Sequence, residues 1–259
     1  MSKQPALMST IILGTRIHAV SLNQVISCIS DWAHEKQSTF ICFCNVHSLV
    51  SAQSDPLLYG ALSKADLALP DGAPIAWIMR RRLWPDQVRL NGPDVMWKLL
   101  AEAAKQKLSV YLFGSTTETL VQLVQNIKIA FPLLRIAGFS APPYTIGTID
   151  LARAASDAKR INQSGAQLVF VGLGCPKQEK WMALQHKQIN AVMLGVGAAF
   201  DYHAGTLQRA PLSWQHYGLE WLYRITQEPY RLLPRYLITN SLFLLKLMGE
   251  IRNNSHQKK

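Results

Sequence analysis

Short apolar runs alternate with amphipathic stretches along the first two hundred residues. The runs "STFICFC", "LSVYLFG", "AQLVFVG" and "AVMLG" are almost continuously apolar, and a stretch with helical spacing follows the first three. Continuous apolar runs are typical of strands buried on both faces, as in a parallel sheet covered by helices. The pattern therefore predicts a doubly wound α/β fold with a mostly parallel sheet for residues 1–204.

The pattern changes after about residue 205. Residues 214–251 are amphipathic, and we expect helices there with interruptions at Glu228-Pro229 and at Pro234. The most apolar part, residues 236–248, is shorter than the roughly 20 residues that span a bilayer. We predict that residues 205–259 form a basic, helical appendage that lies on a membrane without crossing it.

Composition and charge narrow the choice of partners. With 49% hydrophobic and 17% charged residues, the chain is a folded protein rather than a disordered one. The net charge is +11, and residues 204–259 hold eight Lys and Arg against three Glu. These cations are interleaved with Trp, Tyr and Leu, and no nucleic-acid-binding motif occurs. We therefore expect an anionic membrane surface as a partner and no nucleic acid.

A signal-peptide pattern and a disulfide framework are both missing, which favours the cytoplasm.

One carboxylate stands out at the predicted end of a strand. Asp71 lies in "LALPDGAPIAW", where Pro70 and Gly72 are typical turn residues but apolar residues flank the turn on both sides. Asp71 is either a turn former or a carboxylate held in a pocket for chemistry. Ligands of doubly wound folds bind at the carboxyl ends of strands, so Asp71 is well placed for either role.

Two glycine-containing turns are candidates for binding phosphate. In "YLFGSTTETL", Gly114 and Ser115 precede a predicted helix, whose free amides either cradle phosphate or are simply capped. In "VGLGCPKQEKW", Gly172 and Gly174 end a strand and Lys177 stands in the first turn of the next helix. A cation there opposes the helix dipole, so a bound anion and ordinary capping are about equally good explanations.

Two further groups complete the candidate site. Asp201 and His203 follow the last predicted strand, and a lone histidine of this kind is more often structural than catalytic. Arg224, Arg231 and Arg235 are spaced by seven and four residues, which places them on one face of a helix where they grip a diphosphate or form a solvated basic face. No Asp-x-Asp motif and no metal-ligand spacing occurs, so we expect no metal and no cofactor.

In this order, the motifs resemble the WecG/TagA/CpsF family of glycosyltransferases. The matching blocks run from about residue 10 to 240: "FCNVHSLVSAQSDP", "ADLALPDGAPIAW", "VRLNGPDVM", "VYLFGS", "GFSAPPY", "FVGLGCPKQEKWM", "GVGAAFDYHAGTLQRAP" and "GLEWLYRITQEPYRLLPRYL". The resemblance implies a Rossmann-like fold whose C-terminal appendage meets the inner face of the plasma membrane and completes the active site.

The resemblance also implies a reaction. Family members are inverting, metal-independent enzymes that move an N-acetylmannosamine-type or uronic-acid sugar from a UDP donor to an undecaprenyl-diphosphate-linked saccharide, in the synthesis of surface polysaccharides. Asp71 matches the catalytic base, Gln178 the motif glutamine, and the three arginines those of the appendage. Asn45, Asn91 and Gly92 match positions that line the same cleft.

One departure and two alternatives accompany this interpretation. Phe43 stands where many members have a threonine near the substrate, and this change leaves the identity of the sugar open. A nucleotide-sugar epimerase or dehydrogenase needs a Gly-x-Gly-x-x-Gly turn after the first strand, which "IILGTRIHAV" lacks. A non-catalytic membrane scaffold predicts that Asp71 is dispensable. A homo-oligomer is left open.

Overall fold

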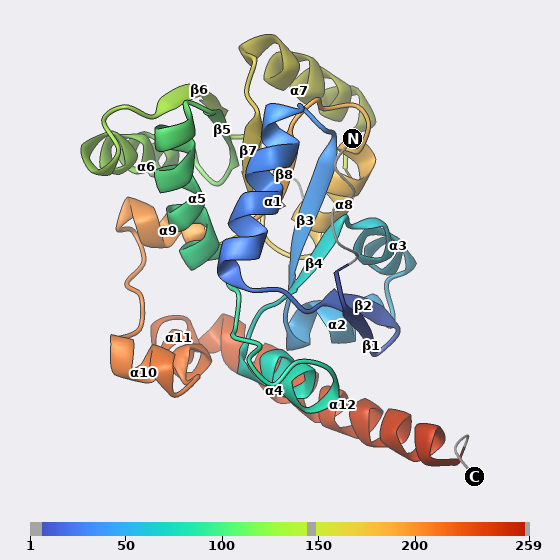
Figure 1. Ribbon diagram of the computed structural model, residues 1–259. Coiled ribbons are helices and arrows are strands. Elements are labelled where there is room, and N and C mark those ends of the chain that lie inside the picture. The colour runs from blue at the N-terminus through green and yellow to red at the C-terminus, as the bar shows by residue number, and fades with distance from the viewer. Residues whose placement is uncertain (1–6, 144–148, 257–259) are drawn as a thin grey trace.

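A computed structural model describes residues 7–143 and 149–256 of the chain. Its centre is a six-stranded sheet in the order β4-β3-β8-β7-β5-β6, and every neighbouring pair is parallel (Figure 1). The strands are β3 (Thr39–Cys44), β4 (Leu67–Pro70), β5 (Ser109–Gly114), β6 (Arg135–Ser140), β7 (Leu168–Gly172) and β8 (Val192–Gly195). The chain runs outward to β4 on one side and to β6 on the other, which confirms the doubly wound α/β fold.

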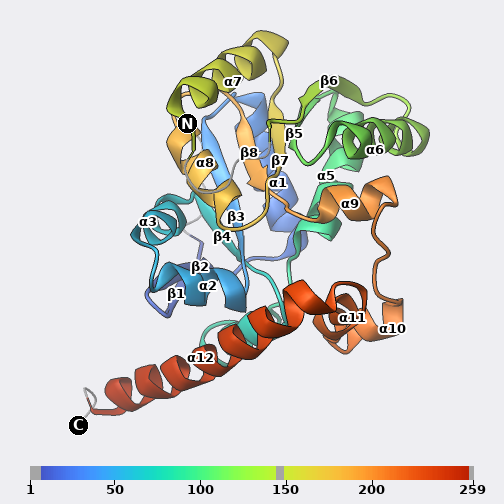
Figure 2. The ribbon, with the colours of Figure 1, turned by 180° about the vertical axis from the view of Figure 1, so that it is seen from behind.

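Helices cover both faces of this sheet (Figures 1 and 2). One face carries α1 (Leu22–His34), α5 (Gly92–Gln106) and α6 (Thr117–Ala130); the other carries α3 (Pro56–Lys64), α7 (Leu151–Ser164) and α8 (Lys177–Gln185). Successive residues of β3 alternate between the two cores: Phe40 and Cys42 pack in one, Ile41 and Phe43 in the other. All six residues of β3 are buried, which is why its sequence is almost continuously apolar.

The first apolar segment lies outside the main sheet. Residues 9–18 form an antiparallel hairpin of β1 (Ser9–Ile12) and β2 (Thr15–His18), which packs beside β4. The backbone amide of Ala68 in β4 donates to Nδ1 of His18 at 3.0 Å. An epimerase or dehydrogenase would have a dinucleotide-binding glycine turn after its first strand. In this protein, the turn after the first strand instead joins the two strands of a hairpin.

Five short helices and one long helix complete the described part of the structure. α2 (Val46–Ala52) and α4 (Ala73–Arg82) follow β3 and β4, and α9 (Ala199–Ala204) follows β8. The C-terminal segment contains α10 (Leu212–His216), α11 (Glu220–Gln227) and α12 (Pro229–His256), and α12 runs past α2 and α4 and projects beyond the body (Figures 1 and 2).

The expected interruption at Glu228-Pro229 separates α11 from α12, but the one expected at Pro234 is wrong. The helix continues through Pro234, although proline costs it a backbone hydrogen bond. Packing explains this, because Leu232 is fully buried before the proline and Phe243 is buried after it. In the described part of the chain, no helix has both the length and the apolar character needed to cross a bilayer.

Candidate active site

A cleft of about 960 Å³ lies at the carboxyl ends of the strands, and α11 and α12 close one side of it. Twelve of the predicted residues line it: Asn45, Asp71, Asn91, Gly92, Ser115, Gly172, Gly174, Gln178, Asp201, Arg224, Arg231 and Arg235. Gly114 and Lys177 are not among the described residues that line it. The structure thus brings together residues from five strand ends and from the C-terminal helices.

Asp71 directly follows β4 and is only partly exposed. Its backbone amide donates to the carbonyl of Cys44 at 2.9 Å, and Nδ2 of Asn45 donates to its carboxylate at 3.4 Å. Gly72, with φ +85°, then turns the chain into α4. Burial raises the pKa of Asp71, while the charge of Arg89 and the Asn45 amide oppose that rise. The turn at Pro70–Gly72 therefore exists, and the Asp71 that it contains lines the cleft.

Asn45 has two roles at the end of β3. Its side-chain oxygen caps α2 by accepting from the backbone amide of Ser48 at 3.1 Å, and its amide nitrogen faces Asp71. Asn91 has the same kind of role at α5, where its oxygen accepts from the amide of Asp94 at 2.9 Å. Capping fixes the orientation of both side chains, so each is held rigidly at the cleft wall.

The glycines at this edge allow the backbone segments to approach closely. A Cβ at Gly92 would lie 2.7 Å from the carbonyl oxygen of Val196, and one at Gly114 would lie 2.6 Å from the backbone of Gly172. Ser115 adopts φ +56°, and its amide donates to the carbonyl of Gly172 at 3.0 Å. Gly114 therefore has a packing role beneath the cleft, and Ser115 is the residue of that turn that reaches it.

Gln178 is buried, and neighbouring protein groups satisfy its amide. Its nitrogen donates to the Gly195 carbonyl at 2.8 Å and to Glu179 at 2.9 Å, and its oxygen accepts from the Gly174 amide at 3.1 Å. These bonds tie the end of β7 to the end of β8. Burial raises the pKa of the neighbouring Glu179, whose Oε2 has no hydrogen-bond partner among the described residues.

The three appendage arginines converge on the cleft from two different helices. Arg224 belongs to α11, whereas Arg231 and Arg235 belong to α12, so the predicted single helix face is wrong. Glu228, at the break between the helices, accepts from Arg224 at 3.2 Å and pairs with Arg231. The Nε atoms of Arg224 and Arg235 are buried and, within the described residues, have no hydrogen-bond partner. The arrangement leaves donors for an anionic ligand.

Asp201 lies across the cleft on α9. Burial raises the pKa of its carboxyl, opposed by the charges of Arg224 and Arg231 and by a hydrogen bond from Ser115. His203, on the same helix, donates from Nε2 to the carbonyl of Pro93 at 3.0 Å and stacks on Trp97 with ring centroids 4.4 Å apart. The histidine is thus structural.

Three cleft residues escaped the sequence analysis. Arg89 and Glu220 form an ion pair of 2.8 Å at the cleft wall. His47 is the second residue of α2, and burial and the charge of Arg235 lower its pKa to about 4. All three lie within the motif blocks that match the family, and this position was the only feature of the sequence that could have indicated them. Their pairing depends on helices far apart in the sequence and has no local signature.

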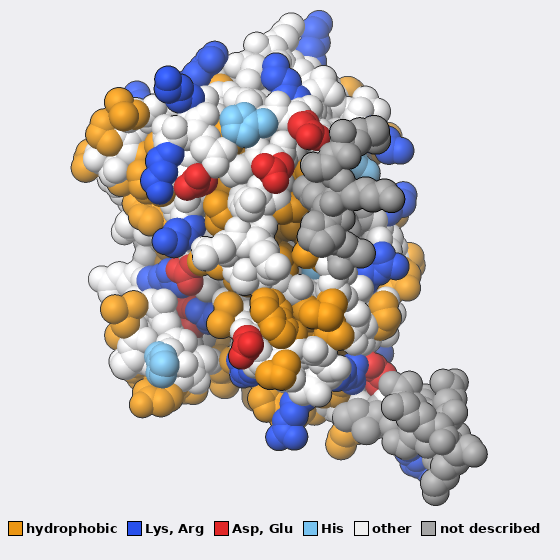
Figure 3. Space-filling model, viewed as in Figure 1, with side chains coloured by type: hydrophobic (Ala, Val, Ile, Leu, Met, Phe, Trp, Pro, Cys, Tyr) orange, Lys and Arg blue, Asp and Glu red, His pale blue; other side chains and the backbone are white. Residues whose placement is uncertain are grey.

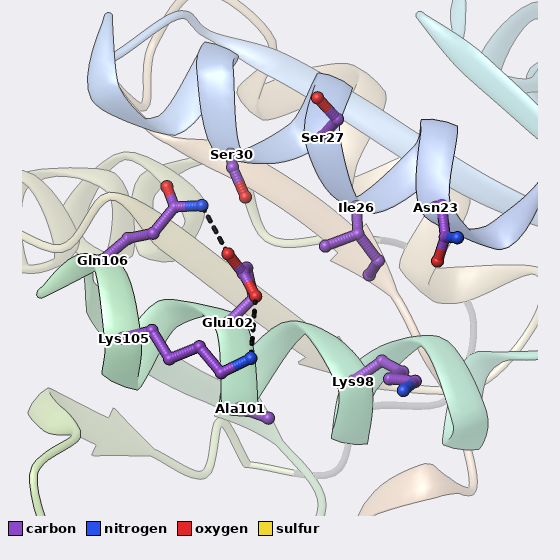
Figure 4. Close-up of a pocket in the computed structure, with 9 residues that line it drawn as sticks. All are labelled: Asn23, Ile26, Ser27, Ser30, Lys98, Ala101, Glu102, Lys105 and Gln106. Atoms are coloured by element: carbon purple, nitrogen blue, oxygen red, sulfur yellow. Dashed lines mark hydrogen bonds and ion pairs between the residues drawn. The ribbon is translucent and has the colours of Figure 1, made fainter.

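A second hollow, of about 410 Å³, lies between α1 and α5 and shares no lining residue with the cleft (Figure 4). Glu102 there accepts from Gln106 at 2.7 Å and lies 3.6 Å from the ammonium of Lys105, so its charge is already paired. Within residues 7–143 and 149–256, no three His, Cys, Asp or Glu side chains gather in a way that would hold a metal ion.

Comparison with known proteins agrees with this geometry. The sequence matches the family described as "Glycosyl transferase WecG/TagA/CpsF family" over residues 10–257. An N-acetylglucosaminyldiphosphoundecaprenol N-acetyl-beta-D-mannosaminyltransferase of Bacillus spizizenii (strain ATCC 23059 / NRRL B-14472 / W23) is 31% identical over 198 residues, 76% of this chain and 74% of that protein. The protein of the same name from Bacillus subtilis (strain 168) is 33% identical over 214 residues, 79% of this chain and 80% of that protein. Because the family match spans nearly the whole chain, this protein belongs to the WecG/TagA/CpsF family of glycosyltransferases.

Proposed function

We propose that this glycosyltransferase moves an N-acetylmannosamine-type sugar from a UDP donor to an undecaprenyl-diphosphate-linked saccharide, with inversion, in the synthesis of a cell-surface polysaccharide. The names of the Bacillus relatives support the sugar and the lipid-linked acceptor. A uronic acid is the alternative sugar, because Phe43 lines the cleft where many members have a threonine. The observation that carries the proposal is the position of Asp71 in a cleft that four arginines also line.

The proposed chemistry is a single displacement. The ionised Asp71 takes the proton of the acceptor hydroxyl as that oxygen bonds to the anomeric carbon. The bond from this carbon to the UDP oxygen breaks on the opposite face, and UDP leaves with the bonding electrons. A raised pKa makes Asp71 a stronger base, provided that the pH is high enough to ionise it.

Arginines meet the charge that develops on the leaving diphosphate. Arg224 and Arg235 each have a buried Nε without a partner among the described residues, and Arg231 is half exposed at the same wall. Donors that are already oriented need little reorganisation when charge builds up in the transition state. The amide of Ser115 donates to Gly172 and its hydroxyl donates to Asp201, so we expect the arginines to contribute more than this turn.

The surface of the C-terminal helices supports action at a membrane. Trp77 of α4 and the α12 residues Leu237, Ile238, Leu245 and Met248 are each about half exposed or more. Figure 3 shows hydrophobic side chains gathered over the region of α4 and α12, with Lys and Arg side chains at its margin. An apolar face flanked by cations suits an anionic bilayer surface, and we propose that the protein binds the inner face of the plasma membrane peripherally.

Asp71→Asn is the decisive test. With UDP-N-acetylmannosamine and an undecaprenyl-diphosphate-linked N-acetylglucosamine acceptor, we expect turnover to fall about 10²–10⁴-fold, the usual contribution of a general base. Binding of UDP, measured by calorimetry, should persist. Asp31→Asn, on the exposed side of α1, is the matched control and should keep full activity. Full activity of Asp71→Asn would refute the role of this residue as the base. A wild-type protein without any transferase activity would favour the membrane scaffold.

A further inference from the structure

Glu220 connects the C-terminal helices to the core of the active site. It is the first residue of α11, and its carboxylate lies 2.8 Å from Nη2 of Arg89 and 3.1 Å from Nε of Arg209. The side chains of Glu220 and Arg89 are 13% and 20% exposed. An ion pair with so little exposure is sensitive to the loss of either partner, because the remaining charge is left partly desolvated.

Arg89 shares the cleft with two carboxylates. It precedes Asn91 in the loop between α4 and α5, lines the cleft with both Asp71 and Glu220, and is paired with Glu220. Its positive charge lowers the pKa of Asp71, whereas the negative charge of Glu220 raises it. The two members of the ion pair therefore act on Asp71 in opposite directions.

Few other groups act on Asp71. The Asn45 amide and the backbone amide of Gly72 are neutral hydrogen-bond donors to it. The Cys44 thiol at the end of β3 is fully buried, and burial raises its pKa so far that it stays neutral. Arg89 and Glu220 are thus the charged residues with the largest effects on the pKa of Asp71. Without Glu220, Arg89 would have Asp71 as a carboxylate partner in the same cleft. The guanidinium would then occupy the Asp71 carboxylate and compete with the acceptor hydroxyl, whose proton Asp71 takes.

We propose that Glu220 is a positioning residue, which holds Arg89 away from Asp71 and so keeps the Asp71 carboxylate open to the acceptor hydroxyl. This inference rests on the proposed role of Asp71 as the base. It makes the docking of α11 a condition for catalysis, because the carboxylate that holds Arg89 arrives with that helix. A purely structural Glu220 would hold α11 in place without altering how Asp71 titrates.

Glu220→Gln tests the inference, since glutamine keeps the size and one hydrogen bond but removes the charge. We expect the midpoint of the acidic limb of kcat/KM against pH to move down by about one pH unit, as Arg89 turns to Asp71. We expect kcat to fall about tenfold, with a smaller change in the KM for the UDP-sugar. Glu250→Gln removes the same charge from the C-terminal segment at its far end, where Glu250 pairs with Arg82, and is the matched control.

Two further variants separate positioning from structure. Glu220→Asp keeps the charge and should keep the wild-type midpoint even if the stability falls. In the double variant Glu220→Gln with Arg89→Gln, no guanidinium remains to bind Asp71, so the midpoint should rise above that of Glu220→Gln alone.

The outcomes distinguish this inference from the proposed function. If Asp71→Asn is inactive but Glu220→Gln has an unchanged midpoint, the inference is overturned and the base assignment stands. Equal shifts in Glu220→Gln and Glu250→Gln, or in Glu220→Gln and Glu220→Asp, would overturn it as well. If Asp71→Asn retains full activity, the base assignment itself fails.

Discussion

Gly172, at the end of β7, has no room for a side chain. A Cβ added there would lie 2.6 Å from Cδ2 of Phe200 and 2.9 Å from two further atoms of the same ring. Phe200 is fully buried in α9, directly before Asp201. Gly172→Ala must therefore displace the ring or the end of β7, because contacts shorter than 3.0 Å do not persist.

The cost follows from this geometry. The φ angle of Gly172 is not in the left-handed region, so alanine meets no backbone penalty and the cost is one of overpacking. Overpacking a filled core destabilises by about 1–3 kcal/mol, and we expect about 2–3 kcal/mol here because the Phe200 ring is fully buried. Displacement of Phe200 also moves Asp201 and its hydrogen bond with Ser115, so UDP binding should weaken.

The measurement is equilibrium unfolding in urea, followed by tryptophan fluorescence, with calorimetry for UDP. Gly60→Ala is the matched control: Gly60 lies inside α3, no atom lies within 4 Å of its added Cβ, and alanine there should stabilise by about 0.5–1 kcal/mol. If the free energy of unfolding of Gly172→Ala lies within about 0.5 kcal/mol of wild type, the close approach of Gly172 to Phe200 is refuted.

Two other predictions concern stability. Burial raises the pKa of Glu179, so its contribution to stability is full below the unfolded value of 4.5 and is lost as pH rises through the folded pKa. Glu179→Gln should therefore gain stability relative to wild type between pH 4.5 and 8 in urea unfolding, and parallel pH curves would contradict this. Arg82→Gln breaks the 2.7 Å ion pair with Glu250 and the bond to the Ile11 carbonyl. This variant should lose about 0.5–1 kcal/mol of unfolding free energy. Backbone hydrogen exchange should become faster in the second half of α12 but not in α5. Equal protection of α12 in the variant and in wild type would show that this ion pair does not hold the helix.

Several local features were predictable from residues close together in the chain. Asn45 ends an apolar run and starts a helical pattern, and in the structure it caps α2. Asp71 follows a strand and precedes a glycine with positive φ, as a Pro-Asp-Gly turn favours. Capping and turn preferences act over about four residues, so one sequence suffices to place them. The carboxyl ends of parallel strands then bring these side chains to one edge.

Predictions that extended local spacing across a longer segment were less successful. The spacing of Arg224, Arg231 and Arg235 indicated one helix face, but the chain breaks at Glu228 and the residues meet through the packing of α11 and α12. Pro234 suggested a helix end, yet burial of the residues around it outweighs one lost hydrogen bond. Lys177 remains a predicted anion-binding residue, although it does not line the cleft.

The sequence by itself determined the alternation of strands and helices that makes the doubly wound fold, the turn at Asp71 and the family, because these depend on short apolar patterns and on motif residues. Only the tertiary structure decided which charges face one another in the cleft. Arg89 and Glu220 are distant in the chain and become partners because α11 packs against the loop before α5. Such pairing depends on the shape of the whole core, and no local preference encodes it.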